Sequence, residues 1–215
     1  MTSMKSTTLY SIPQSSTQDD TSILLDMQSC FANLRLGGQV LLNNESGHHL
    51  FIAVDGLDNK SLNAFRSMQL GRSPMLVLSG ERADAIGLEF ASAISVSIDL
   101  NDTADDLYAL AAAHPAKVTH RPVFQEDHAD AALSLLMKAK FLPACLCFTN
   151  VSNAEALIDQ GVKVIDEETI TRFDTAKTNT LRRKSEAPIP VRGGINTRMV
   201  AVSYTHLTLP TILLV

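Results

Sequence analysis

The sequence predicts an α/β fold, a mixed sheet flanked by helices. Short apolar runs bounded by glycine, asparagine or proline, such as Met75–Leu78 and Ala144–Thr149, are typical of buried strands. Between these runs lie stretches whose apolar residues recur every three or four positions, as in Asp127–Lys140, and this spacing is typical of amphipathic helices. Because such strands and helices alternate from residue 22 to residue 174, we expect one layered α/β domain there.

The individual elements follow from the same two periodicities and from capping residues. We expect helices at residues 22–36, 59–70, 79–87, 101–113, 127–140, 152–160 and 167–173. We expect strands or extended segments at residues 39–42, 50–54, 75–78, 93–100, 117–124, 144–149 and 162–165. The expected helix N-caps are Ser79, Asp102 or Thr103, Ser152 and Asp166.

The two ends of the chain differ from this domain. Residues 1–21 are rich in serine, threonine, glutamine and aspartate, and we expect them to be disordered. Residues 175–186 are polar and basic and are predicted to be a linker, and an apolar, extended pattern restarts at residues 187–202. From Ser203 to Val215 there is neither a charge nor a strand-turn pattern, and we expect this tail to be non-native.

Composition argues against several classes of partner. The chain of 215 residues has a formal net charge of −5 and no basic stripe, so nucleic acid is not an expected partner. It has no apolar run of 18 residues and no signal-peptide pattern, so we expect no membrane partner and a cytoplasmic location. Three cysteines, Cys30, Cys145 and Cys147, are too few for a disulfide scaffold and have no zinc-ligand spacing, so they are predicted to be core residues.

A polar loop between two predicted strands is the first candidate for chemistry. Residues 43–49 separate the apolar runs and include Glu45, His48 and His49. A His-His-Glu cluster can bind a metal, but adjacent residues at a strand start point to opposite faces. We therefore expect a solvated hairpin loop whose asparagines and Ser-Gly pair supply positive-φ turn positions.

His128 is the second candidate, at the start of the most regular helix. A neutral imidazole there can act as a base, whereas the structural alternative is a helix-start residue beside Glu126 and Asp127. Nucleotide-binding glycine motifs and a Gly-x-Ser-x-Gly elbow are absent from the sequence.

Several strings, in order, resemble 3,4-dihydroxy-2-butanone 4-phosphate synthase, an enzyme family of riboflavin biosynthesis. Residues 50–55 (LFIAVD) are similar to that family's "LIFAAE", residues 78–88 (LSGERADAIGL) to "ALTPERADRLGL", and residues 95–99 (SVSID) to "TVSVDA". Residues 127–143 resemble "GHTEAAVDLARLAGLPP". The resemblance covers residues 25–174 and implies the family's fold, a homodimer and, for an active member, magnesium.

The resemblance also points to what is missing. The family's acidic loop, "DEDRENEGD", corresponds to residues 43–49, where Glu45 is the one acid. His128 falls on the family's metal-binding histidine, the catalytic glutamate falls near Thr149, and the segment "TGISAADRA" has no counterpart. We therefore predict a catalytically inactive domain without a cofactor, in which Glu45 and His128 are vestigial site residues.

A second resemblance concerns residues 186–201, which look like the first strands of GTP cyclohydrolase II, "EAKLPTPWGDFLMVGF". It implies that the chain is the N-terminal part of a GTP cyclohydrolase II polypeptide, with GTP as substrate and zinc in the cyclohydrolase domain. The synthase-like domain would then serve as a scaffold, dimerisation module or regulator. Two alternatives stay open: an active synthase using Glu45, Asp55 and His128 with magnesium, and a module that only binds a partner or ligand.

Overall fold

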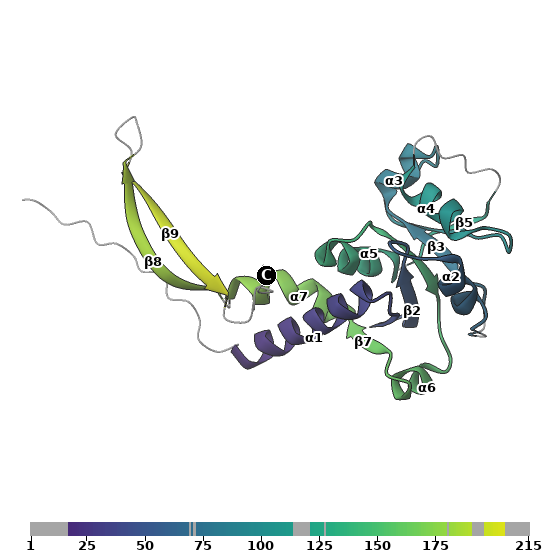
Figure 1. Cartoon of the computed structure of the whole chain (residues 1–215), viewed down its shortest axis with the longest axis horizontal. Helices are drawn as coiled ribbons and strands as arrows, with labels where there is room; N and C mark the ends of the chain where they lie inside the picture. The colour runs from purple at the N-terminus through teal and green to yellow at the C-terminus, as the bar shows by residue number, and fades with distance from the viewer. Residues whose placement is uncertain are drawn as a thin grey trace, which may run out of the picture. The chain divides into compact units, whose positions relative to one another are not determined.

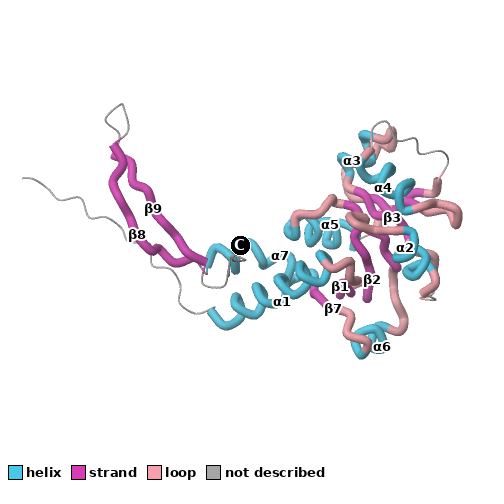
Figure 2. Tube along the Cα trace, viewed as in Figure 1, coloured by secondary structure: helices cyan, strands magenta, loops and turns pink. Residues whose placement is uncertain are grey.

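The computed structural model describes residues 17–68, 70, 72–113, 121–126, 128–179, 181–190 and 196–204. Leu25–Phe173 forms one compact unit, and the described parts of the two chain ends form another. Figure 1 and Figure 2 show the helices and strands of both units. No helix among the described residues has the length and apolar character needed to cross a membrane.

The compact unit contains helices and strands in alternation. Its helices, with two that extend into the other unit, are α1 (Thr17–Arg35), α2 (Asn59–Arg66), α3 (Gly80–Ala85), α4 (Ala104–Ala112), α5 (His128–Ala139), α6 (Ala154–Asp159) and α7 (Glu167–Asn179). Its strands are β1 (Val40–Asn44), β2 (Gly47–Ala53), β3 (Met75–Leu78), β4 (Ile94–Ser97), β5 (Val123–Phe124), β6 (Ala144–Phe148) and β7 (Lys163–Asp166).

Seven strands form one mixed sheet in the order β5-β4-β3-β6-β2-β1-β7. The β1–β7 pair is parallel, and the other neighbours are antiparallel. At the centre, β6 is buried along its whole length between β2 and β3. The expected fold class, a mixed sheet flanked by helices, is confirmed.

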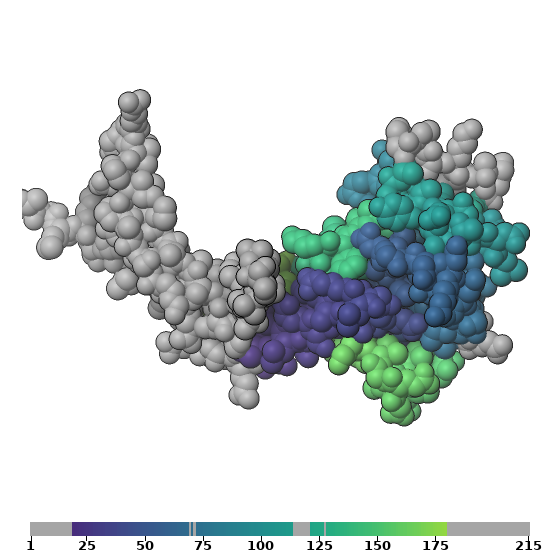
Figure 3. Space-filling model, viewed as in Figure 1, coloured from purple at the N-terminus to yellow at the C-terminus, as the bar shows by residue number. Residues whose placement is uncertain are grey.

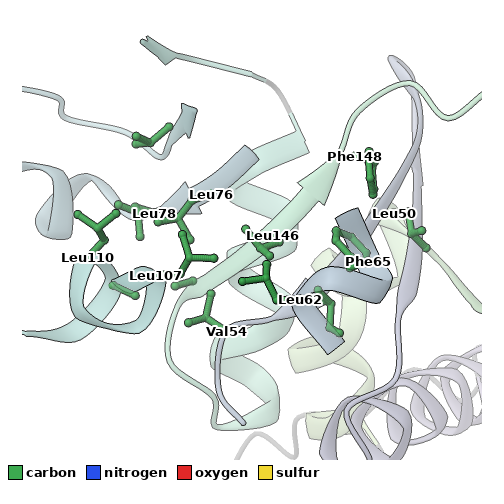
Figure 4. Packing of buried hydrophobic residues seen from close by; sticks show 14 of the residues in the cluster. Leu50, Val54, Leu62, Phe65, Leu76, Leu78, Leu107, Leu110, Leu146 and Phe148 are labelled. Atoms are coloured by element: carbon green, nitrogen blue, oxygen red, sulfur yellow. The ribbon is translucent and has the colours of Figure 1, made fainter. Parts of the chain in front are cut away.

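One face of the sheet carries the larger apolar core. Alternate residues of the strands, such as Leu50, Leu76 and Leu146, point to this face because side chains alternate along a strand. They pack against Leu62 and Phe65 of α2 and against residues of α4 (Figure 4). The ring centroids of Phe65 in α2 and Phe148 in β6 lie 4.8 Å apart, so this contact joins the helix to the sheet.

The intervening strand residues face α5. Phe51, Val77, Cys145 and Cys147 are all buried, as are most residues of α5. Toward the β7 edge, residues of α1 and of the α6–β7 segment lie side by side around a cavity of about 340 Å³. In Figure 3 these are the purple and bright green atoms of the described surface. The cysteines are core residues, as predicted, and burial raises the pKa of Cys30 to about 11.

The first hairpin is tighter than predicted. The expected seven-residue loop is reduced to a two-residue turn at Glu45 and Ser46, because Asn43 and Asn44 extend β1 and Gly47 to His49 begin β2. Of the turn formers, Gly47 adopts a positive φ, of 129°, whereas neither asparagine does. The loop prediction was therefore wrong in length and in the residues that supply the left-handed backbone.

Several helix boundaries follow the predicted caps. Ser79 accepts a hydrogen bond from the Arg82 backbone N–H, and Thr103 forms a capping box with Asp106. The predicted Ser152 cap is wrong, since Asn153 occupies the N-cap of α6 without a side-chain hydrogen bond. The strand predicted at residues 93–100 ends at Ser97, and Leu100, which lies beyond it, is 90% exposed.

The chain ends also differ from expectation. Helix α1 begins at Thr17, within the segment expected to be disordered, and residues 1–16 lie outside the described residues. The Asn179 side chain donates to Asp20 Oδ2 at 3.0 Å, which ties the end of α7 to the start of α1. Residues 175–186 contain the end of α7 and the start of a strand rather than an irregular linker.

That strand, β8 (Leu181–Pro190), pairs antiparallel with β9 (Asn196–Tyr204) in a separate two-stranded sheet. The register is irregular between Arg183 and Ser185. Ser203 and Tyr204, of the tail expected to be non-native, belong to β9, and residues 205–215 lie outside the described residues.

Arg82 joins two helices, and its loss is expected to destabilise the unit. Its guanidinium donates to the carbonyl oxygens of Ala109, Leu110 and Ala113 at the end of α4, at 3.0, 2.7 and 2.5 Å. R82M removes all three of these hydrogen bonds from the end of α4, where carbonyls have few intrahelical donors, and should lower the free energy of unfolding by about 2 kcal/mol. Urea denaturation measures this change.

Arg172 provides the matched control. Its side chain is 44% exposed and pairs with Glu168 at 3.3 Å across one helical turn. An exposed pair of this kind contributes less than about 0.5 kcal/mol, so R172M should leave the unfolding curve almost unchanged. Equal effects of the two substitutions would contradict the assigned role of Arg82.

Candidate functional site

Polar side chains gather at one end of the sheet, where β2 and β3 begin and β6 ends. Since β2 and β3 both run antiparallel to β6, their first residues lie beside the last residues of β6. The described residues have five buried polar or charged side chains, of which Asp20 belongs to the chain-end unit. The other four are His49 at the start of β2, Thr149 after β6, Ser95 in β4 and His128 at the start of α5.

His49 and His128, here called the histidine pair, stack on each other. Their ring centroids are 4.2 Å apart and their planes are inclined by 13°. The two residues are 1% and 2% exposed. The pair therefore joins the start of β2 to the start of α5 through a buried contact.

The hydrogen bonds of His49 determine its protonation. Its Nε2 lies 3.1 Å from Asn44 Oδ1 and 3.1 Å from Ser46 Oγ. A carboxamide oxygen only accepts, so Nε2 carries the proton and Nδ1 is the bare nitrogen. Asn44 Oδ1 also accepts from the backbone N–H and the hydroxyl of Ser46, at 3.0 and 2.8 Å. The pair is thus tied to the β1–β2 turn.

His128 has the less satisfied ring. Its Nε2 lies 3.3 Å from Glu126 Oε2 in a geometry that falls short of a hydrogen bond, and no partner satisfies it. The Ser95 hydroxyl donates to the same carboxylate oxygen at 3.5 Å. His49 Nδ1 is likewise buried without a partner. Each ring of the pair therefore buries one nitrogen that has no hydrogen-bond partner.

Burial keeps both rings neutral. It lowers the pKa of His49 to about 4, with a smaller effect from the charge of His48. It also lowers the pKa of His128 to about 4, helped by His49. The first turn of α5 disfavours a cation as well, since the amino end of a helix is partly positive. Burial raises the pKa of Glu126, while the charge of Arg72 and the Ser95 hydrogen bond oppose that shift.

The predicted acids do not join the histidine pair. Glu45 lies exposed at the tip of the turn. Asp55 lies six residues beyond His49, roughly 20 Å along the strand direction, and its carboxylate accepts from the Leu142 backbone N–H at 2.5 Å. Thr149, where the family's catalytic glutamate falls, is buried. The set Glu45, Asp55 and His128 is not assembled.

The β1–β2 turn and the loop after β6 are packed tightly against each other. A Cβ added to Gly47 would meet Asn150 Oδ1 at 2.9 Å, so a larger residue there would displace Asn150. The Val151 backbone N–H donates to the His48 carbonyl oxygen at 2.8 Å. These contacts fix the amino end of β2 and hence the position of His49.

The donor set around the histidine pair does not fit magnesium. Mg²⁺ requires near-octahedral oxygen ligands, typically carboxylates with water. Glu126 is the one carboxylate that contacts the pair among the described residues, and the two rings lie in nearly parallel planes, stacked on each other. No three histidine, cysteine, aspartate or glutamate side chains in the described part of the chain are arranged to hold a metal.

A cavity of about 540 Å³ opens beside the same turn, and its charge is negative. Asn43, Asn44 and Ser46 line it together with four carboxylates, those of Glu45, Asp166, Glu167 and Glu168. Among the residues that the structure describes, no lysine or arginine lines it. A cavity with this charge disfavours anionic ligands such as sugar phosphates.

Solved structures share this arrangement of strands and helices. A cation-free 3,4-dihydroxy-2-butanone 4-phosphate synthase aligns with a TM-score of 0.51 and 16% identity, over 71% of this chain and 98% of that one. The same enzyme described with two magnesium ions aligns with a TM-score of 0.50 and 15% identity, over the same shares. The chain has the fold of 3,4-dihydroxy-2-butanone 4-phosphate synthase.

A further similar structure is larger. RibBX, a two-domain 3,4-dihydroxy-2-butanone 4-phosphate synthase from A. baumannii, aligns with a TM-score of 0.50 and 17% identity. The alignment covers 83% of this chain and 66% of RibBX, so the chain spans slightly less than two thirds of that protein. No protein-family profile matches the chain, and no curated protein sequence does either.

Sequence reasoning named both His128 and His49 as candidates but did not predict that they lie together. His49 occupies an inward position of β2, in the same alternation as Phe51 and Ala53, and that alternation was the available signal. The stacking of His49 on His128 joins residues 79 positions apart, and no local pattern predicts such a contact.

The histidine pair predicts a loss of stability in acid. Each ring has a pKa of about 4 when folded and roughly 6.5 when unfolded, so between these values the unfolded chain binds protons that the folded chain does not. The free energy of unfolding should therefore fall as pH drops from about 6.5 to 4, by up to roughly 3 kcal/mol per ring. Urea denaturation across this range measures it.

H128F removes one of the two titrating rings while keeping an aromatic stack. The pH dependence of the unfolding free energy should then lessen by about 1.4 kcal/mol per pH unit within this window. A raised carboxyl pKa stabilises the folded state as the pH falls, so Glu126 contributes to the pH dependence with the opposite sign to the two rings. E126Q removes that contribution. An unchanged slope in H128F would contradict the role of the pair.

Proposed function

We propose that this chain is a riboflavin biosynthesis protein whose domain at residues 22–174 has kept the synthase fold without synthase activity. The fold similarity supports the pathway. The low identity, 15–17%, leaves activity to be argued from the site itself. The observation that carries the proposal is the histidine pair, sealed by stacking and tied to the β1–β2 turn.

The reaction of the synthase family places two demands on a site. Proton abstraction next to a carbonyl needs a base in contact with the substrate, and a divalent cation needs several oxygen ligands. His128 stacks on His49 and is 2% exposed, while Glu45 is exposed at the β1–β2 turn. The nearest cavity beside the turn is lined by carboxylates, which repel a phosphorylated substrate. Neither demand is met by these residues.

The direct test is an assay of the purified chain with ribulose 5-phosphate and magnesium. We expect formate release no greater than in a blank without protein, because the site offers no cation ligand set and no accessible base. The alternative, an active synthase, would show formate release that disappears in H128A and decreases in E45Q. That result would overturn the proposal.

We further propose that the domain belongs to a GTP cyclohydrolase II polypeptide. The support is the resemblance of residues 186–201 to the first strands of that enzyme, together with their position in the hairpin β8–β9. In this arrangement the synthase-like domain serves as a scaffold or dimerisation module. GTP and zinc would belong to the cyclohydrolase domain, whose product is 2,5-diamino-6-ribosylamino-4(3H)-pyrimidinone 5′-phosphate with formate and diphosphate.

The genomic sequence beyond codon 202 tests this linkage. An open frame with three cysteines at zinc-ligand spacing is expected, and the corresponding full-length protein should open the imidazole ring of GTP in the presence of zinc. A gene that stops within a few residues of Ala201 would exclude it. Light scattering of the full-length protein, with and without residues 22–174, tests the homodimer and the dimerisation role.

A further inference from the structure

The strand β7 forms one edge of the seven-stranded sheet, and its outer side is open. It pairs with β1 on one side, and no strand among the described residues pairs with its other side. Lys163, Val164 and Asp166 are exposed, whereas Ile165 is buried. Residues 163–165 make no backbone hydrogen bond to any described residue outside the sheet. An edge with unpaired N–H and C=O groups can accept a further strand.

The opposite edge of the sheet is protected in ways that β7 is not. There, β5 has two residues and follows Pro122, whose carbonyl oxygen accepts from the Ser97 backbone N–H at 3.0 Å. Short edge strands and proline are usual means of preventing further pairing. By contrast, β7 has four residues, contains no proline and pairs with β1 without a bulge.

The cavity of about 340 Å³ between α1 and the α6–β7 segment follows this open edge. Its lining includes four consecutive residues, 161–164. Because successive side chains of an extended chain point to opposite faces, consecutive residues share a cavity that runs along the side of the chain. Residues of α1 form the other wall, and Figure 1 shows α1 and β7 side by side. The cavity therefore lies where an added strand would begin.

Apolar side chains are exposed beside the edge. Val164 is 37% exposed and Ile158 is 43% exposed, and Val162 is half-buried. All three line the cavity. Val162 and Val164 are two positions apart and therefore lie on the same face of the sheet. Aliphatic side chains of an added strand would cover this apolar surface and remove it from water.

The carboxyl end of β7 is acidic. Asp166 lies on the same face as Val164, and Glu167 and Glu168 follow it at the start of α7. All three acids line the cavity beside the β1–β2 turn. The Asp166 carboxylate accepts from the Asn43 side chain at 2.8 Å, and a carboxylate can accept several hydrogen bonds. A cationic side chain at this end of an added strand would be attracted, and an anionic one repelled.

We propose that the outer edge of β7 binds an extended, basic segment of a partner protein, which adds to the sheet as a further strand. The segment runs antiparallel to β7, with lysine or arginine opposite Asp166 and aliphatic residues opposite Val164 and Val162. In this mode of recognition, backbone hydrogen bonds give affinity and alternate side chains give specificity. The inference does not depend on whether the domain has synthase activity.

A second copy of β7 fits this edge less well than a basic segment does. Residues that face each other across an antiparallel pair lie on the same face of the sheet. Lys163 and Asp166 are three positions apart and lie on opposite faces, so the lysine of one copy could not face Asp166 of the other. Charge complementarity therefore favours a partner with the alternating pattern basic-x-aliphatic-x-aliphatic.

The test is an NMR titration of the full chain with the peptide acetyl-Lys-Thr-Val-Thr-Val-Thr-amide. Saturable shifts of the amide signals of residues 161–166 are expected. Replacing the peptide's lysine with glutamate should weaken binding at least about tenfold, because attraction to the carboxylates becomes repulsion. The peptide acetyl-Lys-Val-Val-Thr-Thr-Thr-amide, of equal composition without the alternation, should weaken it by a similar factor.

Two protein variants locate the binding. V164K places a charge on the apolar part of the edge and should weaken binding of the first peptide at least about tenfold. Y108K makes the same change at a side chain of α4 that is 49% exposed and lies outside the cavity lining, so it should bind like the unaltered chain. Both positions are exposed, so the two variants should unfold at similar temperatures.

The inference is overturned if the first peptide does not bind, if V164K binds it as well as Y108K does, or if the glutamate peptide or the non-alternating peptide binds equally well. Light scattering of the same samples tests the other occupant. A dimer that V164K dissociates, together with no peptide binding, would assign the edge to a second copy instead.

Discussion

The burial of β6 on both faces is the constraint on which the compact unit depends. Ala144, Leu146 and Phe148 face the larger core, Cys145 and Cys147 face α5, and all five side chains are almost fully inaccessible. Because β2 and β3 both pair with β6, a shift of β6 by one residue would exchange the two faces and move both neighbouring strands. This register therefore positions the end of the sheet at which the histidine pair lies.

At this end of the sheet, neutral polar side chains hold the β1–β2 turn. The β1–β2 turn is held by the Asn44 carboxamide, which accepts hydrogen bonds from Ser46 and His49. A carboxylate-rich loop in the same place would be open and repelled by its own charges. Here a neutral side chain organises the turn, and the paired rings of His49 and His128 fill the space beneath. The hydrogen bonds of Asn44 and Ser46 satisfy one nitrogen of His49, whereas His49 Nδ1 and His128 Nε2 are buried without a hydrogen-bond partner.

Charge is divided unevenly at the same end of the sheet. The cavity beside the β1–β2 turn is lined by carboxylates, whereas a cavity beside β3 and β4 is lined by two arginines. Arg66 and Arg121 together hold the loop after β4. The backbone carbonyls of this loop fix the Arg66 guanidinium, and the ion pair of Arg121 with Asp102 fixes the loop.

The sequence alone determined the fold class, because alternating apolar runs and helical spacings are local properties that survive at 15–17% identity. It also predicted the cap at Ser79, and it gave Thr103 as one of two candidates for the next cap, because capping depends on residues three positions apart. Tertiary structure alone decided that His49 stacks on His128, that Glu45 and Asp55 lie apart from them, and that Arg66 holds a loop 33 to 36 residues away. Those contacts depend on strand order and register, which no short stretch of sequence encodes.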